Sequence, residues 1–328
     1  MLRPIAEIVF HINQHEAESW RDKRRLALFG RIAAFCEARG VAHCVEVRNP
    51  ALTRPVSCAS DGRLHIVEDG RVRGDGWLNA ATAYLQGFWH LDPNGILAES
   101  SAKDACFNPR SVAKEPANLF FRDLQQRFVK PRLSRYGQPR AQDLGVPKDS
   151  IALFLQGKTP QKSGQCALSM QEMILAVCKG AGHRKVVVKP HPLSPIECAY
   201  AIASAAEAGA GFEVFTGNIH DLLEVCAVTV SANSAAAMEG FLHRKPAILF
   251  GRADYESITT KVESSELFSE ALATALSVNW RFAKMLYWYF SQYTVELDAP
   301  DFEARLCAIF ERAGLRFDSS EGLDASTA

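Results

Sequence analysis

Short β-branched runs that alternate with helix-forming segments constrain most strongly how this chain can fold. One run is Val186-Val187-Val188 and another is Ala227-Val228-Thr229-Val230, and each lies between segments with helical patterns. A short apolar run of this kind is typical of a strand buried on both faces of a parallel sheet. The alternation therefore predicts a doubly wound α/β domain built around these two strands.

Side chains that bind anions follow both runs directly. Lys189-Pro190-His191-Pro192 follows the first, and Ser231-Ala232-Asn233-Ser234 follows the second, ahead of an Ala-rich helical pattern at 235–243. Ligands of open α/β sheets bind at the carboxyl ends of the strands, where both clusters are predicted. The candidate phosphate ligands are Lys189, His191, Ser231, Asn233 and Ser234. The alternative is that the prolines end a strand and that Ser and Asn only cap a helix.

Composition sets the size and the class of the protein. The chain has 328 residues, 48% of them hydrophobic, which is enough for about two globular domains. Lys plus Arg and Asp plus Glu both number 37, so net charge gives no argument for a nucleic-acid partner. The nine cysteines form no C-x-x-C pair and no metal-ligand spacing. We expect reduced thiols, with neither a disulfide nor a metal site.

The termini and the apolar segments indicate the cellular location of the protein. The first residues lack the apolar core of a signal peptide, and no window reaches the roughly 20 apolar residues of a membrane span. The aromatic, partly basic segment 279–295 favours a helix that packs the domains together over an interfacial membrane helix. The tail from residue 318 is small and polar, which predicts disorder. We expect a cytoplasmic protein, with peripheral association at the inner membrane left open.

The N-terminal region opens with a β-α-β pattern. Residues 5–12 read as a strand, 16–39 as a long helix closed by Gly40, and 41–47 as a second strand. This order predicts a doubly wound domain at the N-terminus as well.

Two adjacent carboxylates follow a further strand candidate at 63–67. The sequence there is Glu68-Asp69-Gly70, and its local pattern favours the turn of a β-hairpin with Arg71-Val72-Arg73. The functional alternative is that Glu68 and Asp69 stand at a strand end as nucleophile and acid/base.

A second domain is predicted after a linker. Residues 134–150 are rich in Pro, Gly and charge, and residues 151–155 then form a buried strand ahead of Gln156-Gly157-Lys158-Thr159. A P-loop is excluded, because position 153, where that motif needs Gly, is Leu. Two tandem doubly wound domains predict a GT-B fold, two Rossmann-like domains that face a central cleft. We place an acceptor and catalytic domain at 1–147, a donor domain at 148–278, and a helical segment across the domains with a polar tail at 279–328.

Four separated segments give the chain a family resemblance. They are Val67–Gly70 with Asp92–Gly95, Leu155-Gln156, Lys189–Pro192, and Ser231–Tyr255. On these segments the chain resembles the bacterial capsule polysaccharide biosynthesis family, whose best understood members are β-Kdo glycosyltransferases that use CMP-Kdo. The Lys-Pro-His-Pro segment with its Ser-rich loop is also similar to CDP-glycerol transferases and, more loosely, to bacterial polysialyltransferases.

The resemblance implies roles for individual residues. His191 and the Ser231–Ser234 loop would take the phosphate of a cytidine nucleotide, Gln156 would lie by the nucleotide, and Glu239 near the ribose. Asp69, with Glu68 beside it, would face the anomeric carbon, which overrules the hairpin turn. A carboxylate nucleophile would then give retention in two steps. CMP would leave without a metal or other cofactor, its charge neutralised by Lys189 and His191.

The resemblance thus implies a metal-independent transferase that moves an acidic sugar, above all Kdo, from CMP to a surface polysaccharide or glycolipid. The sequence departs from the family's pattern at Arg71 and at 253–257, which leaves the identity of the sugar and of the acceptor open. Arg71, Arg73 and Lys103 are candidates for contact with an anionic acceptor or with the sugar carboxylate. The alternatives are a CDP-glycerol or CMP-sialic acid transferase and a noncatalytic nucleotide-sugar-binding component of capsule assembly.

Overall fold

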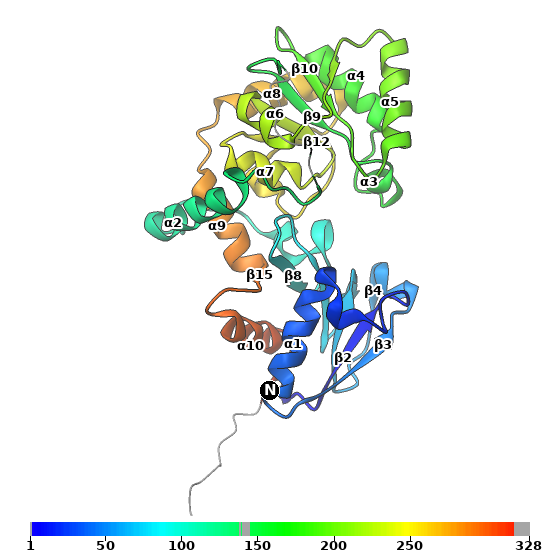
Figure 1. Ribbon diagram of the computed structural model, residues 1–328, viewed down its shortest axis with the longest axis vertical. Helices are drawn as coiled ribbons and strands as arrows, with labels where there is room; N and C mark the ends of the chain where they lie inside the picture. Colours follow the sequence, from blue (N-terminus) through cyan, green and yellow to red (C-terminus); the bar gives the residue numbers. More distant parts are fainter. Residues whose placement is uncertain (1, 138, 140–144, 318–328) are drawn as a thin grey trace, which may run out of the picture. The chain divides into compact units, whose positions relative to one another are not determined.

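The chain forms two compact α/β units (Figure 1). A computed structural model describes residues 2–137, 139 and 145–317. Unit 1 comprises the residues up to 83, residues 87–101 and those from 293 on, and unit 2 comprises residues 84–86 and 102–292. The division falls near residue 101, and not near the predicted 147, because the helices between these positions pack within unit 2.

Unit 2 is built on a sheet of six parallel strands. Its spatial order is β11 (Glu213–Val214), β10 (Val186–Lys189), β9 (Ile151–Phe154), β12 (Val228–Ser231), β13 (Ala247–Leu249) and β14 (Thr260–Lys261). Counted along the chain this order is 3-2-1-4-5-6, the arrangement of a doubly wound nucleotide-binding sheet. The order reverses between β9 and β12, so a crevice for a ligand is expected beyond the carboxyl ends of these two strands.

Helices bury both faces of this sheet, as the β-branched runs predict. One core holds Val186 and Val188 together with α4 (Met170–Gly180), α5 (Pro195–Glu207) and α8 (Phe268–Ser277). The other core holds Val187 together with α6 (Ile219–Val225) and the start of α7 (Ala236–Leu242). Alternate residues of one strand therefore enter opposite cores. Unit 2 also contains α2 (Lys114–Leu124) with a π-helical turn at Gln125–Val129, the short α3 (Thr159–Lys162), and α9 (Phe282–Tyr293).

Unit 1 has a mixed six-stranded sheet. Its order is β15 (Val295–Glu296), β8 (Phe88–Asp92), β7 (Trp77–Thr82), β5 (Leu64–Glu68), β2 (Glu7–Ile12) and β3 (Ala42–Val47). The strands β2, β3, β5 and β7 are parallel, whereas β8 runs antiparallel to β7 and to β15. The core includes Phe10, Phe29, Phe302 and Phe310, contributed by β2, α1 (Ala27–Glu37) and α10 (Phe302–Arg312).

The first predicted helix is shorter in the structure than the sequence pattern indicates. The predicted helix at 16–39 is α-helical only from Ala27 to Glu37, after 3-10 turns at Trp20–Asp22 and Arg24–Leu26 that no side chain caps. Gly40 has the expected left-handed backbone, with φ of 66°.

The segment predicted at 279–328 is divided between the two units. Its first helix, α9, belongs to unit 2, whereas β15 and α10 belong to unit 1. Helix α9 buries Phe282, Met285, Leu286, Trp288, Tyr289 and Phe290, so its aromatic face serves the core and not a membrane interface. Within the part of the chain that the structure describes, no helix has the length and apolar character to cross a bilayer. The predicted disordered tail, residues 318–328, lies outside the described residues.

Candidate functional site

The carboxylate pair of unit 1 stands at the end of a central parallel strand. Strand β5 ends at Glu68 and pairs on its two sides with β2 and β7. The following strand, β6 (Val72–Arg73), pairs with β4 (Val56–Ser57) and not with β5. The hairpin favoured by local pattern is therefore wrong, because both edges of β5 are already occupied. Glu68 and Asp69 lie instead at the carboxyl edge of the sheet, as the resemblance implies.

Glu68 is buried and held by several donors. Its carboxylate accepts a hydrogen bond from the Asn13 amide at 2.7 Å, forms an ion pair with Arg25, and lies 3.5 Å from Arg48 Nη1. Its side chain is only 5% exposed, and burial raises the pKa of this carboxyl above its usual value. Both oxygens of the Glu68 carboxylate are thus engaged within the protein, which makes Glu68 an anchor of the loop.

Asp69 is the accessible carboxylate of the pair. Its side chain is 49% exposed, and its backbone is left-handed, with φ of 51°. Asp69 N donates to Ala80 O at 2.8 Å, and Gly70 N donates to Val67 O at 3.3 Å, which fixes the turn. A left-handed backbone costs a non-glycine residue about 1 kcal/mol, and such residues gather at functional sites. Asp69 is thus fixed in place with its carboxylate open to solvent.

Two residues beside Asp69 were missed by the sequence reasoning. Arg48 Nη1 donates to Glu68 O and lies 3.9 Å from Asp69 Oδ2. The buried amide of Asn79 donates to Val72 O at 2.8 Å and accepts from Val72 N at 2.8 Å, which ties β6 to β7. Arg48 directly follows β3, so the same strand-end reasoning could have found it. Asn79 lies within an apolar strand and has no such signal.

Asp92 does what its turn sequence predicts. It is buried at the end of β8, and its Oδ1 accepts from the amides of Asn94 at 2.8 Å and Gly95 at 3.3 Å. Its Oδ2 accepts from the Ser101 amide at 3.0 Å and from the Ser101 hydroxyl. Both oxygens are engaged in holding the turn together, so Asp92 acts as a structural residue here.

In unit 2, the two strands at the reversal point present side chains that bind each other. Gln156 follows β9, and Asn233 follows β12. Gln156 Nε2 donates to Asn233 Oδ1 at 3.0 Å, and Asn233 N donates to Gln156 Oε1 at 2.9 Å. Asn233 Nδ2 also donates to Gln165 Oε1 at 3.0 Å and to Arg252 O at 2.9 Å. Two residues predicted on separate grounds therefore form one rigid element where a ligand is expected.

The serines of the second cluster shape the loop before α7. Ser231 Oγ accepts from Ser234 N at 3.0 Å, and Ser234 Oγ accepts from Ala236 N at 3.2 Å. Tyr255 donates its hydroxyl hydrogen to Ser234 O at 2.7 Å. The N-cap of α7 is Ala235, which makes no side-chain capping bond. The predicted serine cap is present one residue earlier, because the Ser234 hydroxyl accepts from the amide of Ala236, the first residue of α7.

Lys189 and His191 leave the end of β10 in defined orientations. Lys189 Nζ donates to Gly217 O at 2.5 Å, and burial lowers the pKa of this amine to about 8. His191 Nδ1 accepts from Leu193 N at 3.2 Å, which places the proton of the neutral ring on Nε2. Burial, and then the charge of Arg135, lower the pKa of His191. A neutral His191 can therefore donate one hydrogen bond through Nε2.

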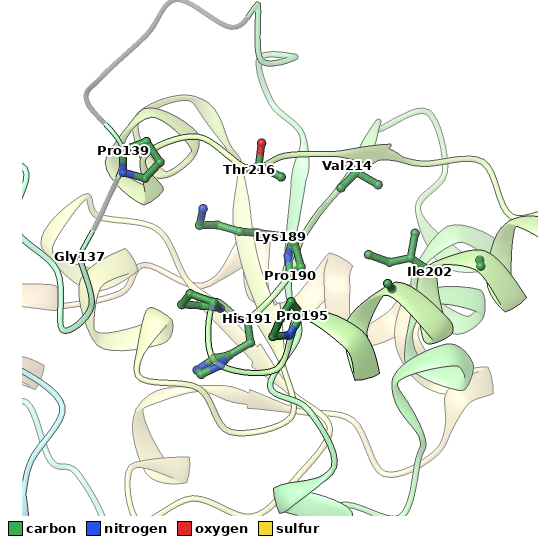
Figure 2. A pocket seen from close by; sticks show the side chains of 12 residues that line it. Gly137, Pro139, Lys189, Pro190, His191, Pro195, Ile202, Val214 and Thr216 are labelled. Carbon is green, nitrogen blue, oxygen red and sulfur yellow. The ribbon is translucent and has the colours of Figure 1, made fainter.

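A cavity of about 640 Å³ opens beside these two residues. Figure 2 shows Lys189 reaching toward Pro139, while Ile202 and Val214 lie on the opposite side of Pro190. The volume falls in the range of small-molecule sites, about 300–1,000 Å³, and the mixture of apolar wall and few polar groups is typical of them.

Glu239 is a buried carboxyl group with an unused oxygen. The residue is 3% exposed, and its Oε1 accepts from Ser134 Oγ at 2.7 Å and from Arg135 N at 3.4 Å. Among the described residues, Oε2 has no hydrogen-bond partner. Burial raises the pKa of Glu239 to about 7, although Lys189 and Arg135 oppose this rise. Such an oxygen is suited to a hydroxyl donor of a ligand.

The predicted linker at 134–150 thus contributes to the site. Ser134 and Arg135 hold Glu239, and the Tyr136 ring meets the His191 ring edge-on, with centroids 5.1 Å apart. Sequence reasoning missed this role because the segment has linker composition. All seven candidate donor-site residues lie in unit 2, and Glu68 and Asp69 lie in unit 1. In the ranges that the structure describes, no group of three or more metal-ligating side chains is found.

Comparisons with known proteins give one family match and several matches of fold. Residues 163–267, about a third of the chain, match the model of the family described as capsule polysaccharide biosynthesis protein, which confirms the resemblance over that segment. The fold is similar to that of the Thermosulfurimonas dismutans KpsC β-Kdo 2,7 transferase, at 13% identity and a TM-score of 0.51, covering 93% of this chain and 99% of that one. This likeness confirms the GT-B class of fold.

Two further structures are more distant. The β-Kdo 2,4 transferase of the same KpsC aligns at 15% identity and a TM-score of 0.49, over 82% of this chain and 90% of that one. WaaG, a glycosyltransferase of lipopolysaccharide biosynthesis, aligns at 14% identity and a TM-score of 0.36, over 94% of this chain and 98% of that one. No curated protein matches the sequence at a significant level.

Proposed function

Because residues 163–267 match the capsule polysaccharide biosynthesis family, we propose that the protein is a glycosyltransferase that takes an acidic sugar, Kdo in the first place, from a CMP donor. The acceptor is a surface polysaccharide or glycolipid. The observation that carries this proposal is the reciprocal Gln156–Asn233 pair at the point where the strand order reverses. Lys189 and His191 stand at the end of the neighbouring strand β10, and the charge of Glu239 acts on Lys189.

Each donor-site residue has a chemical task in this proposal. The charge of Lys189 balances the CMP phosphate and the Nε2–H of His191 donates a hydrogen bond to it, which makes CMP a better leaving group without a metal ion. The free Oε2 of Glu239 accepts a hydrogen bond from a ribose hydroxyl. Gln156 and Asn233 hold the loop that contains Ser231 and Ser234, whose hydroxyls complete the phosphate contact.

Asp69 supplies the nucleophile. Its carboxylate oxygen forms a bond to the anomeric carbon as the bond from that carbon to the CMP phosphate oxygen breaks. An acceptor hydroxyl then displaces Asp69, loses its proton and regenerates the carboxylate, so the configuration is retained overall. Arg48 positions the Asp69 carboxylate through its contacts with Glu68 and Asp69.

Incubation with CMP-Kdo tests this chemistry. We expect the parent protein to release CMP and to gain the mass of one Kdo residue on the peptide that contains Asp69, and Asp69→Asn to do neither. Consumption of CDP-glycerol or CMP-sialic acid in place of CMP-Kdo would identify the alternative donors. CMP binding that survives Asp69→Asn, with no turnover in the parent protein, would indicate a noncatalytic binding component.

A further inference from the structure

A second cavity of unit 2 is lined by positive charge. It has a volume of about 670 Å³ and lies between the segment before α2, the start of α2, the residue after the C-cap of α7, and the start of α9. Its wall includes Arg110, Lys114, Arg244, Arg281 and Lys284, together with the ring of Trp280. Among the described residues that line it there is no carboxylate side chain, and none of them also lines the cavity beside Lys189 and His191.

No carboxylate of the described residues balances these five charges, although Lys284 Nζ donates to Pro109 O at 2.7 Å. Within the described residues, none of the five forms an ion pair with a carboxylate, although the chain carries as many acidic as basic residues. Elsewhere in unit 2, Arg132 is matched by Asp221 and by Glu224, the latter at 3.0 Å. Like charges gathered around one cavity repel one another. An anion in the cavity would remove that repulsion.

The backbone conformation of Arg244 is a second observation that favours an anion site. Arg244 follows the C-cap of α7 and has a left-handed backbone, with φ of 58°, where helices usually place glycine. The Lys245 amide donates to Gly240 O at 2.9 Å and closes the helix end, so this conformation is fixed. The Arg244 guanidinium lies 4.9 Å from the centre of the Phe121 ring. A cation therefore occupies a position that local conformation assigns to glycine.

We propose that this cavity binds a ligand that carries two or more phosphate charges. Three arginines offer paired N–H donors that match phosphate oxygens, and two lysines add point charges. The volume exceeds what a single phosphate needs and fits a diphosphate or a phosphorylated headgroup. The ligand is either a soluble phosphate ester or the headgroup of a phospholipid. The inference does not depend on the proposed transferase activity, because the two cavities have no residue in common.

Titration with inorganic pyrophosphate tests the site. We expect binding by the parent protein that weakens roughly tenfold or more in the double variant Arg110→Gln/Lys114→Gln, since charge-assisted hydrogen bonds are lost. Both side chains are exposed, so the variant should fold. The matched control is Lys162→Gln/Lys179→Gln, which removes the same charge from exposed positions outside the cavity and should bind as the parent does.

Arg244→Gly provides a readout that a structural role would not give. The substitution relieves the left-handed backbone, so the variant should unfold at the same or a higher temperature than the parent and yet bind pyrophosphate several-fold more weakly. Sedimentation with vesicles of phosphatidylcholine plus phosphatidic acid, against phosphatidylcholine alone, distinguishes the source of the phosphate. Vesicle capture that Arg110→Gln/Lys114→Gln abolishes identifies a lipid headgroup, and pyrophosphate binding alone identifies a soluble ester. The proposal is overturned if neither probe binds, or if both double variants behave alike.

Discussion

Gln156 and Asn233 exchange two hydrogen bonds across the point where the strand order of unit 2 reverses. One residue follows β9 and the other follows β12, so the pair fixes the loop ends of two neighbouring strands relative to each other. An element of this kind is set before a ligand arrives, which reduces the ordering cost of binding.

A double-mutant cycle on this pair should show strong coupling. Gln156→Ala and Asn233→Ala each release the same loop, so we expect each to weaken CMP binding several-fold and the double variant to be little worse than either. Residues in direct contact have coupling energies of about 0.5–3 kcal/mol. Calorimetric titration of the four proteins measures the cycle. Strictly additive losses would mean that the two side chains act on the nucleotide independently.

Glu239 should make stability depend on pH between its ordinary pKa and its raised value of about 7. The folded state binds the Glu239 proton more tightly than the unfolded state does, so this group's contribution falls as pH rises from about 4.5 to about 7 and is constant outside that window. Glu239→Gln removes the effect. Denaturation midpoints of both proteins from pH 5 to pH 7.5 should diverge, with a relative loss of roughly 2 kcal/mol in the parent. Parallel midpoint curves would show that Glu239 keeps an ordinary pKa.

Arg48 should matter for turnover and not for nucleotide affinity. It lies in unit 1 beside Asp69, whereas the candidate nucleotide ligands lie in unit 2. We expect Arg48→Gln to lower kcat with CMP-Kdo roughly ten- to hundredfold, because charge-assisted hydrogen bonds to the Glu68–Asp69 turn are lost. CMP affinity should stay unchanged. Arg63→Gln is the control, since Arg63 precedes β5 and pairs with Asp61 at 2.7 Å. Equal losses in both variants would remove any special role from Arg48.

Gly70→Ala should damage the turn after Asp69. A methyl group at Gly70 would come within 2.7 Å of Val67 Cβ and would also collide with Asn79 Oδ1. We expect a loss of stability of about 1–3 kcal/mol, the range of an overpacked site, measured by denaturant unfolding. Gly30→Ala, in α1, meets nothing within 4 Å and serves as the control. A Gly70→Ala protein as stable as the parent would show that the turn can open.

The sheet of unit 2 was predictable because the local sequence pattern of its strands and helices is clear. Val186, Val187 and Val188 can only be a strand with two buried faces, and the polar cluster after it falls at the carboxyl edge in any doubly wound sheet. The same reasoning indicated Asn233, whereas Gln156 was indicated by the family resemblance, and neither argument predicted the hydrogen bonds between them.

What the sequence could not predict depends on contacts between distant segments. The turn at Asp69-Gly70 resembles a hairpin until β2 and β7 take both edges of β5. The segment at Ser134–Tyr136 has the composition of a linker, and its place beside Glu239 and His191 arises from packing within unit 2. The antiparallel pairing of β8 with β7 and β15 is likewise a tertiary outcome, since β15 comes from the far end of the chain.

Calorimetric titration of CMP into the parent protein and His191→Ala, with UMP and GMP as control ligands, tests the central claim most directly. His183→Ala is the matched control, because His183 is an exposed histidine of unit 2 that lines neither cavity. We expect CMP to bind the parent and His183→Ala equally, to bind His191→Ala at least tenfold more weakly, and UMP and GMP not to bind. Failure of CMP to bind the parent, or equal binding to His191→Ala, would contradict a cytidine-nucleotide site at the end of β10.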